Sequence, residues 1–392
     1  MQIQGKFGKL ALAVMGILLF SLSTLAVDES DAVRAIYISA ANVPTNIPGI
    51  YTYAAPPKGF SPVTATDVEL ATYGFPPRPD KQAEPDEYAA WEQAMKTAKI
   101  RWTGELKPLP GGGQRKIPAG SSLLAEVVQP DTTGPKQQNN VTASGVILTN
   151  SQKTWNSKTS FDLIYTVVTV PTVEWAFNST CNDESNGWEY SFAGIDGSIS
   201  PGPADGYPLF EPGLVGGVVE YADCQVGGIL YDSFVGYWPV LNAAPFSVNP
   251  GDVLYTAVSV QGPCNGTVFV SDETTSVSAS YGIGVGACNF IGQNAEWTVT
   301  RNCCSGPGPG PDGEWYLPNT THISFDSGAA QRGNGALSYP GSQASTTMIL
   351  TMMDDSDSQA TETVSQGSGG YQGLHSLFFT TTGCAVDGGC TP

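Results

Sequence analysis

Short runs rich in β-branched and aromatic residues alternate with turn-forming residues from about residue 137 onward. Gly, Pro, Asn and Asp separate these runs at short intervals, which is typical of antiparallel strands joined by tight turns. The runs that predict strands are 162–170, 217–220, 253–260, 267–270, 298–300, 322–325, 346–350 and 377–381. We therefore expect residues 137–392 to form one all-β sandwich or jelly roll.

Residues 86–102 carry a different pattern. Tyr88, Trp91, Met95 and Trp102 recur at helical spacing, so a helix would place them on one face. Acidic residues begin this segment and basic residues end it, which suits the helix dipole. We expect a helix here, and we expect its apolar stripe to pack against another part of the protein.

The start of the chain has the pattern of a secretory signal peptide over residues 1–26. Two lysines precede the apolar run Leu10–Leu22, and small residues follow it. This predicts a secreted, extracellular protein that has no contact with the membrane once the signal is removed. Residues 27–136 then form an N-terminal region rich in proline, which ends in an exposed and cleavable linker at 111–136.

Charge is distributed unevenly along the chain. Residues 1–136 hold 13 basic and 13 acidic residues, whereas residues 137–392 hold four basic residues against 23 acidic ones, which accounts for the whole net charge of −19. A domain with so few positive charges gains little net charge in acid, so the composition favours a protein that works at low pH. It offers no basic patch for nucleic acid.

The cysteines indicate disulfides rather than a metal site. An even number in an exported chain favours disulfide bonds, although the sequence does not fix their pairing. No Cys-x-x-Cys pair occurs, so we expect neither a metal nor another cofactor. The disulfide candidates are Cys181, Cys224, Cys264, Cys288, Cys303, Cys304, Cys384 and Cys390, and the glycosylation candidates are Asn140, Asn178, Asn265 and Asn319.

Carboxylates are the strongest candidates for catalysis. With His322 and His375 as the only histidines, a Ser-His-Asp triad is poorly supplied. A carboxylate near its reference pKa of about 4 acts as a general base in mild acid. Glu220, which ends an apolar run, and Glu296 are the two candidates, and an exposed strand residue is the alternative for each. The lone Asp-Ser-Gly at 326–328 lacks the second copy that an aspartic peptidase needs.

Five segments between about residues 140 and 350 carry family-like motifs in one characteristic order. They are Ser191–Gly197, Tyr231–Pro239, Val248–Leu254, Asn265–Ser278 and Asn294–Thr300. Together they resemble the glutamic peptidases (eqolisins), secreted acid endopeptidases with a concanavalin A-like β-sandwich. Residues 71–80 are similar to the N-terminal region of some glutamic-peptidase-like proteins, so the resemblance implies that residues 27–136 are a propeptide-like segment.

The resemblance also implies a site, from which this chain departs. The family uses a Gln/Glu dyad to activate water. The Gln position falls on Glu220, or on Glu211 in a rival alignment, and the Glu position falls on Thr300, while Glu296 is retained from the same motif. We expect Glu220 beside Thr300 as the general base, with Thr300 and Glu296 orienting the water. The resemblance places Phe192, Asp196, Asp232 and Trp238 along the substrate cleft.

These features predict a monomeric, secreted acid endopeptidase that hydrolyses polypeptides through a carboxylate-activated water. Two alternatives stay open. The first is a catalytically inactive sandwich that binds peptide or glycan. The second is a glycosidase with a carboxylate pair, which needs two carboxyl groups about 5 to 9.5 Å apart. If residues 27–136 are a propeptide, we expect acid to release them by weakening their salt bridges.

Overall fold

The computed structural model describes residues 29–101, 104–109, 135–140, 143–174, 187–196, 199–200, 209–210, 213–223, 228–238, 241–284, 290–301, 319–344, 346–353, 360–366 and 375–381. The predicted signal peptide and most of the predicted linker lie outside these residues. None of the described helices has the length and apolar character that crossing a membrane requires.

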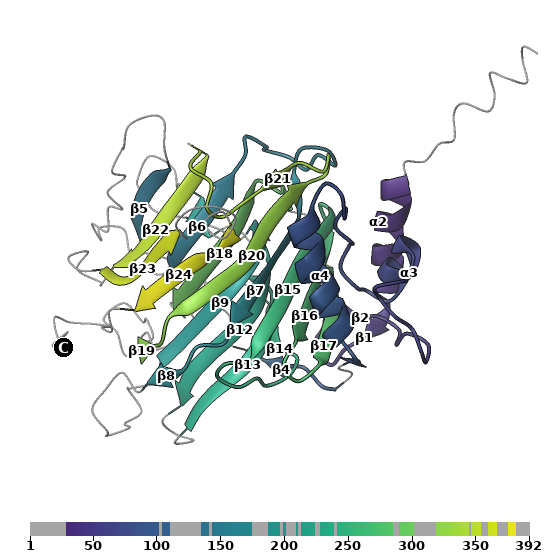
Figure 1. Cartoon of the computed structure of the whole chain (residues 1–392), viewed down its shortest axis with the longest axis horizontal. Coiled ribbons are helices and arrows are strands. Elements are labelled where there is room, and N and C mark those ends of the chain that lie inside the picture. The colour runs from purple at the N-terminus through teal and green to yellow at the C-terminus, as the bar shows by residue number, and fades with distance from the viewer. Residues whose placement is uncertain are drawn as a thin grey trace, which may run out of the picture.

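Two antiparallel β-layers form a sandwich (Figure 1). Layer A contains β14 (Leu241–Ala244), β13 (Gly228–Trp238), β12 (Gly213–Asp223), β9 (Gly187–Asp196), β18 (Asn294–Arg301), β6 (Ala143–Thr149) and β22 (Thr347–Met353), in this spatial order. Layer B contains β20 (Ile323–Arg332), β7 (Phe161–Thr169), β15 (Val253–Gly262), β16 (Asn265–Asp272) and β17 (Val277–Gly284). The all-β prediction is confirmed, and every predicted run overlaps a strand, although the runs 162–170, 322–325 and 346–350 each extend one residue beyond it.

Short strands complete the layers. β23 (Ala360–Gln366) and β24 (Leu377–Thr381) join β22 of layer A to β20 of layer B. β5 (Lys136–Asn140) pairs with β22, and β21 (Leu337–Ser338) pairs with β20. Two small pairs stand apart, β8 (Val173–Glu174) with β19 (Asn319–Thr320) and β10 (Ile199–Ser200) with β11 (Leu209–Phe210).

The main core lies between the layers, and it defines the two faces of layer A. Ala193 and Ile195 of β9 and Val218 of β12 belong to this core. Because side chains alternate along a strand, the intervening residues point the other way. Phe192 and Val219 accordingly belong to a separate apolar cluster on the opposite side of layer A, which we call the outer face.

The N-terminal region covers layer B with helices. It contains α2 (Glu29–Ala40), α3 (Asp67–Thr72) and α4 (Pro85–Thr97). α4 lies across layer B in Figure 1, and its Trp91 and Met95 are buried with Tyr165 and Phe269 of the strands. The predicted helix and its packing are confirmed. The helix ends earlier than predicted, because residues 100–101 form β3 (Ile100–Arg101) on β17, while Trp102 lies outside the described residues.

Strands of the N-terminal region also cover one edge of each layer. β2 (Ile50–Thr52) pairs with β17 of layer B and carries β1 (Val43–Pro44) outside it. β4 (Lys107–Pro108) pairs with β14 of layer A. An uncovered edge would present unpaired N–H and C=O groups. The region therefore takes part in both layers of the sandwich rather than resting on their surface.

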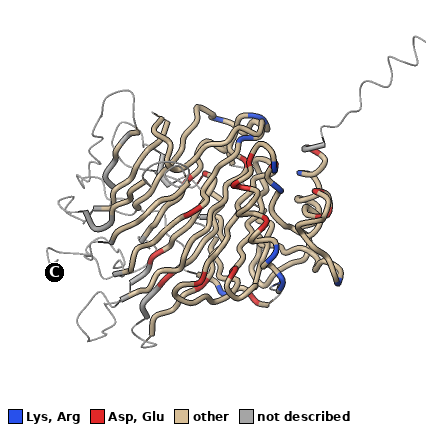
Figure 2. Tube along the Cα trace, viewed as in Figure 1, with Lys and Arg blue, Asp and Glu red and all other residues tan. Residues whose placement is uncertain are grey.

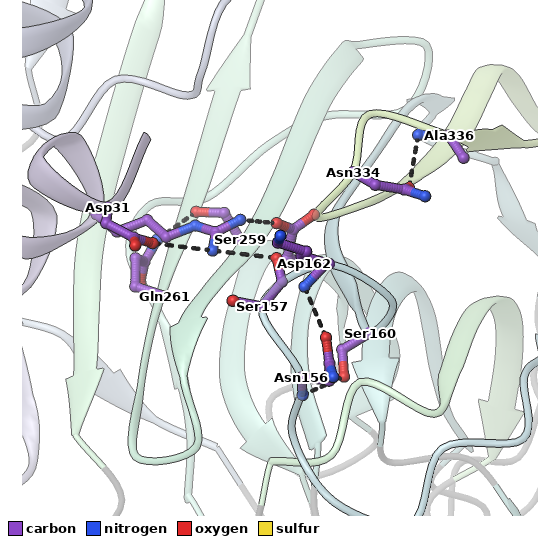
Figure 3. Close-up of polar contacts among 11 residues, drawn as sticks. Asp31, Asn156, Ser157, Ser160, Asp162, Ser259, Gln261, Asn334 and Ala336 are labelled. Atoms are coloured by element: carbon purple, nitrogen blue, oxygen red, sulfur yellow. Dashed lines mark hydrogen bonds and ion pairs between the residues drawn. The ribbon is translucent and has the colours of Figure 1, made fainter. Parts of the chain in front are cut away.

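An ion pair fastens α2 to the sandwich. Arg34 Nη2 lies 2.5 Å from Asp162 Oδ2 at the start of β7, and Arg34 Nη1 donates to the Ser157 carbonyl at 3.3 Å. Figure 3 shows Asp162 and Ser157 at this junction, near Asp31 of the helix. Figure 2 shows Lys and Arg around the helices and on loops at the ends of the strands, whereas Asp and Glu also occur within the strands. At Arg34 and Asp162, opposite charges meet across this interface.

Burial at this interface favours protonated carboxyl groups. Desolvation raises the pKa of Asp162 to about 7 despite Arg34, and it raises the pKa of Glu273, which contacts Gln93 of α4, to about 7. Desolvation also raises the pKa of Glu84 and Glu87 in and beside α4. These groups take up protons on folding, so the free energy of unfolding increases as the pH falls from about 7 towards 4.

We therefore predict that the full chain is more stable in mild acid and keeps its N-terminal region there. Its Tm at pH 4 should exceed that at pH 7.5 by roughly 5 °C or more, measured by circular dichroism. Asp162→Asn should reduce this difference, because the amide does not ionise. Asp31→Asn, which alters an exposed partner of Arg34, should leave the difference unchanged. A Tm that falls on acidification would instead support acid release of the region.

Candidate functional site

Four residues form a row across the outer face of layer A. Thr300 of β18 is the register partner of Tyr190, Tyr190 is the partner of Val219, and Val219 is the partner of Asp232. Directly opposed residues in an antiparallel sheet point to the same face. Tyr190 and Val219 belong to the outer apolar cluster. Thr300 and Asp232 therefore also lie on this face.

Glu220 lies on the other face. It is opposed by Glu189 and Tyr231 in register, and it follows the core residue Val218 by two positions. Its side chain points between the layers and is fully buried. The structure thus does not bring Glu220 and Thr300 together, and it places Val219 on the outer face instead. One residue of register reverses the face of every side chain on a strand, so motif spacing alone did not fix this position.

Glu189 and Glu220 form a buried carboxyl pair within the core side of layer A. Directly opposed residues have Cβ atoms about 5 Å apart. The Tyr231 hydroxyl next to them accepts a hydrogen bond from the Val173 N–H at 2.8 Å, and burial followed by the Glu220 charge raises the pKa of Tyr231. Both glutamates have no exposed surface, so a sugar chain does not reach this pair. Sequence reasoning missed Glu189, whose partner becomes evident only from strand register.

Glu296, Thr298 and Thr300 share the outer face of β18. Glu296 is 2% exposed, and desolvation, followed by the charge of Asp196, raises its pKa well above the ordinary value. Among the described residues, Glu296 Oε1 and the hydroxyls of Thr298 and Thr300 have no hydrogen-bond partner. Glu296 and Thr300 are about 13 Å apart along the strand. The face thus presents a neutral carboxylic acid at low pH, separated from the position of the expected dyad.

A glycine makes room for Glu296. Gly194 is its register partner on β9. A Cβ atom at position 194 would lie 2.7 Å from Val215 Cγ1 and 3.4 Å from Glu296 Oε1. Real Cβ contacts are not that short to Val215, so only glycine lets β9 pass close to β12 and Glu296 here.

Asp196 has a structural role in this region. Its backbone adopts a left-handed conformation with φ of 54° at the end of β9. Its carboxylate accepts backbone N–H groups of Ile291, Gly292, Gln293 and Asn294 at 2.7 to 3.4 Å. Desolvation raises its pKa although these four hydrogen bonds oppose that change. The carboxylate holds the segment that leads into β18. It therefore fixes the start of β18 and, with it, the position of Glu296 on the outer face.

The remaining predicted cleft residues lie around the same face. Phe192 packs against Phe234, with ring centroids 6.2 Å apart. Asp232 Oδ2 lies 3.0 Å from Lys107 Nζ, and its Oδ1 accepts the Ser247 hydroxyl at 2.7 Å. The strand position of Trp238 belongs to β13, but its side chain lies outside the described residues, as does the rival position Glu211.

Two residues of the N-terminal region reach this face, and sequence reasoning did not assign them to it. Lys107 binds Asp232, and Leu109 is buried within the outer apolar cluster. Their one sequence signal is a basic residue and a leucine two positions apart, just before the predicted linker. That signal is too common to indicate a site.

The predicted modification sites are only partly described. Cys264 is disulfide-bonded, and the other seven cysteines lie outside the described residues. Asn265 lies at the start of β16 and is half-buried. Asn140 and Asn319 are described only in their backbone, and Asn178 lies outside the description.

Comparison with known proteins identifies a family whose model this sequence matches. Residues 141–371 match the model of the Peptidase A4 family. Scytalido-glutamic peptidase with a peptide-based transition state analog is 15% identical, with a TM-score of 0.44, covering 62% of this chain and 98% of that one. SCP-B, a member of the Eqolisin family bound to the tripeptide Ala-Ile-His, is also 15% identical with the same coverage and a TM-score of 0.43. Aspergilloglutamic peptidase from Aspergillus niger is 18% identical, with a TM-score of 0.38, covering 50% of this chain and 98% of that one. No curated protein matches.

The environments of Glu296 and Asp196 predict opposite responses to amide substitution. Glu296→Gln should raise the Tm at pH 7.5 and leave it nearly unchanged at pH 4, because the wild-type carboxyl is already neutral in acid. Asp196→Asn should lower stability by about 2 kcal/mol or more at both pH values, because an NH₂ group then faces buried N–H donors. Thermal unfolding measures the Tm and denaturant unfolding measures the free energy of unfolding of both variants at the two pH values, and equal behaviour of the two would contradict the assigned environments.

Proposed function

Because the chain belongs to the Peptidase A4 family, we propose that it is a secreted, monomeric protein whose outer face of layer A binds an extended polypeptide without hydrolysing it. The observation that carries this proposal is the row across the outer face. Thr300, to which the resemblance assigns the family's Glu position, lies in this row beside Tyr190 and Val219, whereas Glu220, to which it assigns the Gln position, faces the core.

The chemistry of these side chains supports binding over catalysis. A threonine hydroxyl does not act as a general base in acid, and valine has no polar group. Glu296 keeps its proton at low pH because its pKa is raised, so it does not remove a proton from water there. What the face retains is aromatic and aliphatic surface with a few polar groups, a composition typical of ligand sites.

One observation favours a second candidate, an endopeptidase that uses Glu296. This carboxyl is buried on the same face as Thr300, and its Oε1 lacks a hydrogen-bond partner among the described residues. A carboxyl with a raised pKa becomes a general base only above that pKa. Hydrolysis by Glu296 would therefore increase towards neutral pH rather than in acid, which separates it from the activity implied by the family resemblance.

The test combines binding and hydrolysis on the same samples. The full chain is incubated with reduced, alkylated casein at pH 3.5 and pH 7, and both bound casein and acid-soluble peptides are measured. We expect casein to bind to the protein. We expect the amount of acid-soluble peptide that the wild type releases to be no greater than the amount that the Glu296→Gln variant releases. Glu220→Gln serves as the control that alters a carboxyl on the core side.

The other outcomes each identify a different mechanism. Peptide release that is lost only in Glu296→Gln would replace our proposal with the second candidate. Release that is lost only in Glu220→Gln would support Glu220 as the base and overturn the proposal. Release of reducing sugar from a polysaccharide would favour a glycosidase, and absence of casein binding would remove the polypeptide ligand.

A further inference from the structure

We infer that the outer face of layer A and the edge of β14 form a binding site for a defined polypeptide pattern: a basic residue followed two positions later by a large aliphatic residue. Residues 107–109 are the occupant supplied by the chain itself. This inference rests on the proposed function, and it adds the sequence that the site selects.

The main chain of the occupant binds as an added strand. β4 pairs antiparallel with β14, with Lys107 opposite Ala244 and Pro108 opposite Ala243. The Leu109 N–H donates to the Asn242 carbonyl at 3.0 Å. Strand addition of this kind gives affinity through backbone hydrogen bonds and leaves selection to alternate side chains. Pro108, the middle residue, is exposed, so the pattern does not restrict that position.

A buried carboxylate selects the basic residue. The Asp232 side chain is 6% exposed and binds Lys107 Nζ at 3.0 Å, whereas the Lys107 side chain is 54% exposed. The Ser247 hydroxyl donates to the other oxygen of Asp232 and fixes its orientation. Burying a carboxylate is costly unless it is paired. The site therefore accepts a long cationic side chain from solvent and disfavours an acidic one.

The outer apolar cluster selects the aliphatic residue. Leu109 is 8% exposed and packs in the outer cluster with Tyr190, Phe192 and Phe234. Ala244 of β14, the strand between β4 and β13, also belongs to this cluster. A polar side chain in this place would lose its hydration without a hydrogen bond in return.

Strand direction determines the order in which the two subsites bind the basic and the aliphatic residue. β4 and β13 are both antiparallel to β14, so they run in the same direction. Lys107 and Leu109 are two residues apart, as are Asp232 and Phe234, and two residues span about 7 Å in a strand. The two subsites therefore read a basic residue and an aliphatic residue in that order along the ligand.

The chain holds its own occupant in place by an anchor just before it. Asn46 exchanges two hydrogen bonds with the backbone of Leu106, Nδ2 to O at 2.8 Å and N to Oδ1 at 2.9 Å. Leu106 itself is buried in the main core. Because this tether gives the occupant a high effective concentration, an external polypeptide must displace residues 107–109 to bind.

The test removes from the full chain the two side chains that fill the subsites, which weakens the hold of its own occupant; we call this double variant the emptied protein. Fluorescence anisotropy measures binding of a labelled Glu-Leu-Lys-Pro-Leu peptide, the sequence of residues 105–109, to the Lys107→Ala/Leu109→Ala variant. We expect at least 10-fold tighter binding than to the wild type. A Lys96→Ala/Val68→Ala variant, which removes the same kind of groups from exposed positions on the helices, should bind as the wild type does.

Peptide and site variants then test the selection. In the emptied protein, replacing the peptide lysine by glutamate should weaken binding at least 10-fold. The Asp232→Asn variant has a side chain of similar shape but no charge. It should therefore bind the lysine and glutamate peptides equally well. Circular dichroism verifies that each variant is folded.

The result also separates this inference from the proposed function. Casein binding without tighter peptide binding by the emptied variant, or equal binding of the lysine and glutamate peptides, overturns the inference alone. Loss of both casein and peptide binding overturns the proposed function as well.

Discussion

Layer A buries apolar side chains on both of its faces, and this constraint decides where every polar group of the site lies. One face fills the core between the layers, and the other carries an aromatic cluster. Successive side chains along a strand point to opposite faces. The position of a polar residue in its strand therefore decides whether its side chain lies on the core side or on the outer face. Glu220 and Thr300 are separated in this way although both belong to family-like segments.

The N-terminal region pairs with both layers of the sandwich and packs against layer B. Its strands pair with β14 and β17, and its helix α4 covers aromatic residues of layer B. Removing it would expose Tyr165 and Phe269 together with two strand edges. The carboxyl groups at the interface prefer to be protonated. We therefore expect acid to strengthen this interface, which is opposite to the effect expected for a propeptide held by surface salt bridges.

The sequence predicted elements better than it predicted their pairing. Runs of β-branched residues between turn residues identified eight of the strands, and apolar spacing identified α4, because both signals are local; strands such as β9 and β13 were not predicted. α2 and α3 were not predicted, although α3 begins with a capping box between Thr66 and Glu69 that the sequence contains. The face of Glu220 depends on how β12 and β13 pair, which motif spacing does not determine. The contact of Lys107 with Asp232 joins positions 125 residues apart, and no local pattern indicates it.

Pro108 gives the outer edge of layer A a further property. A proline has no N–H group, so β4 is a poor template for another strand. Without β4, the edge of β14 would be open to pairing between molecules. That exposure would matter most near the isoelectric point of about 4.3, where charge repulsion no longer keeps copies apart. A chain that has lost β4 would then tend to assemble edge to edge, so the strand that occupies the binding face would also keep the protein dispersed.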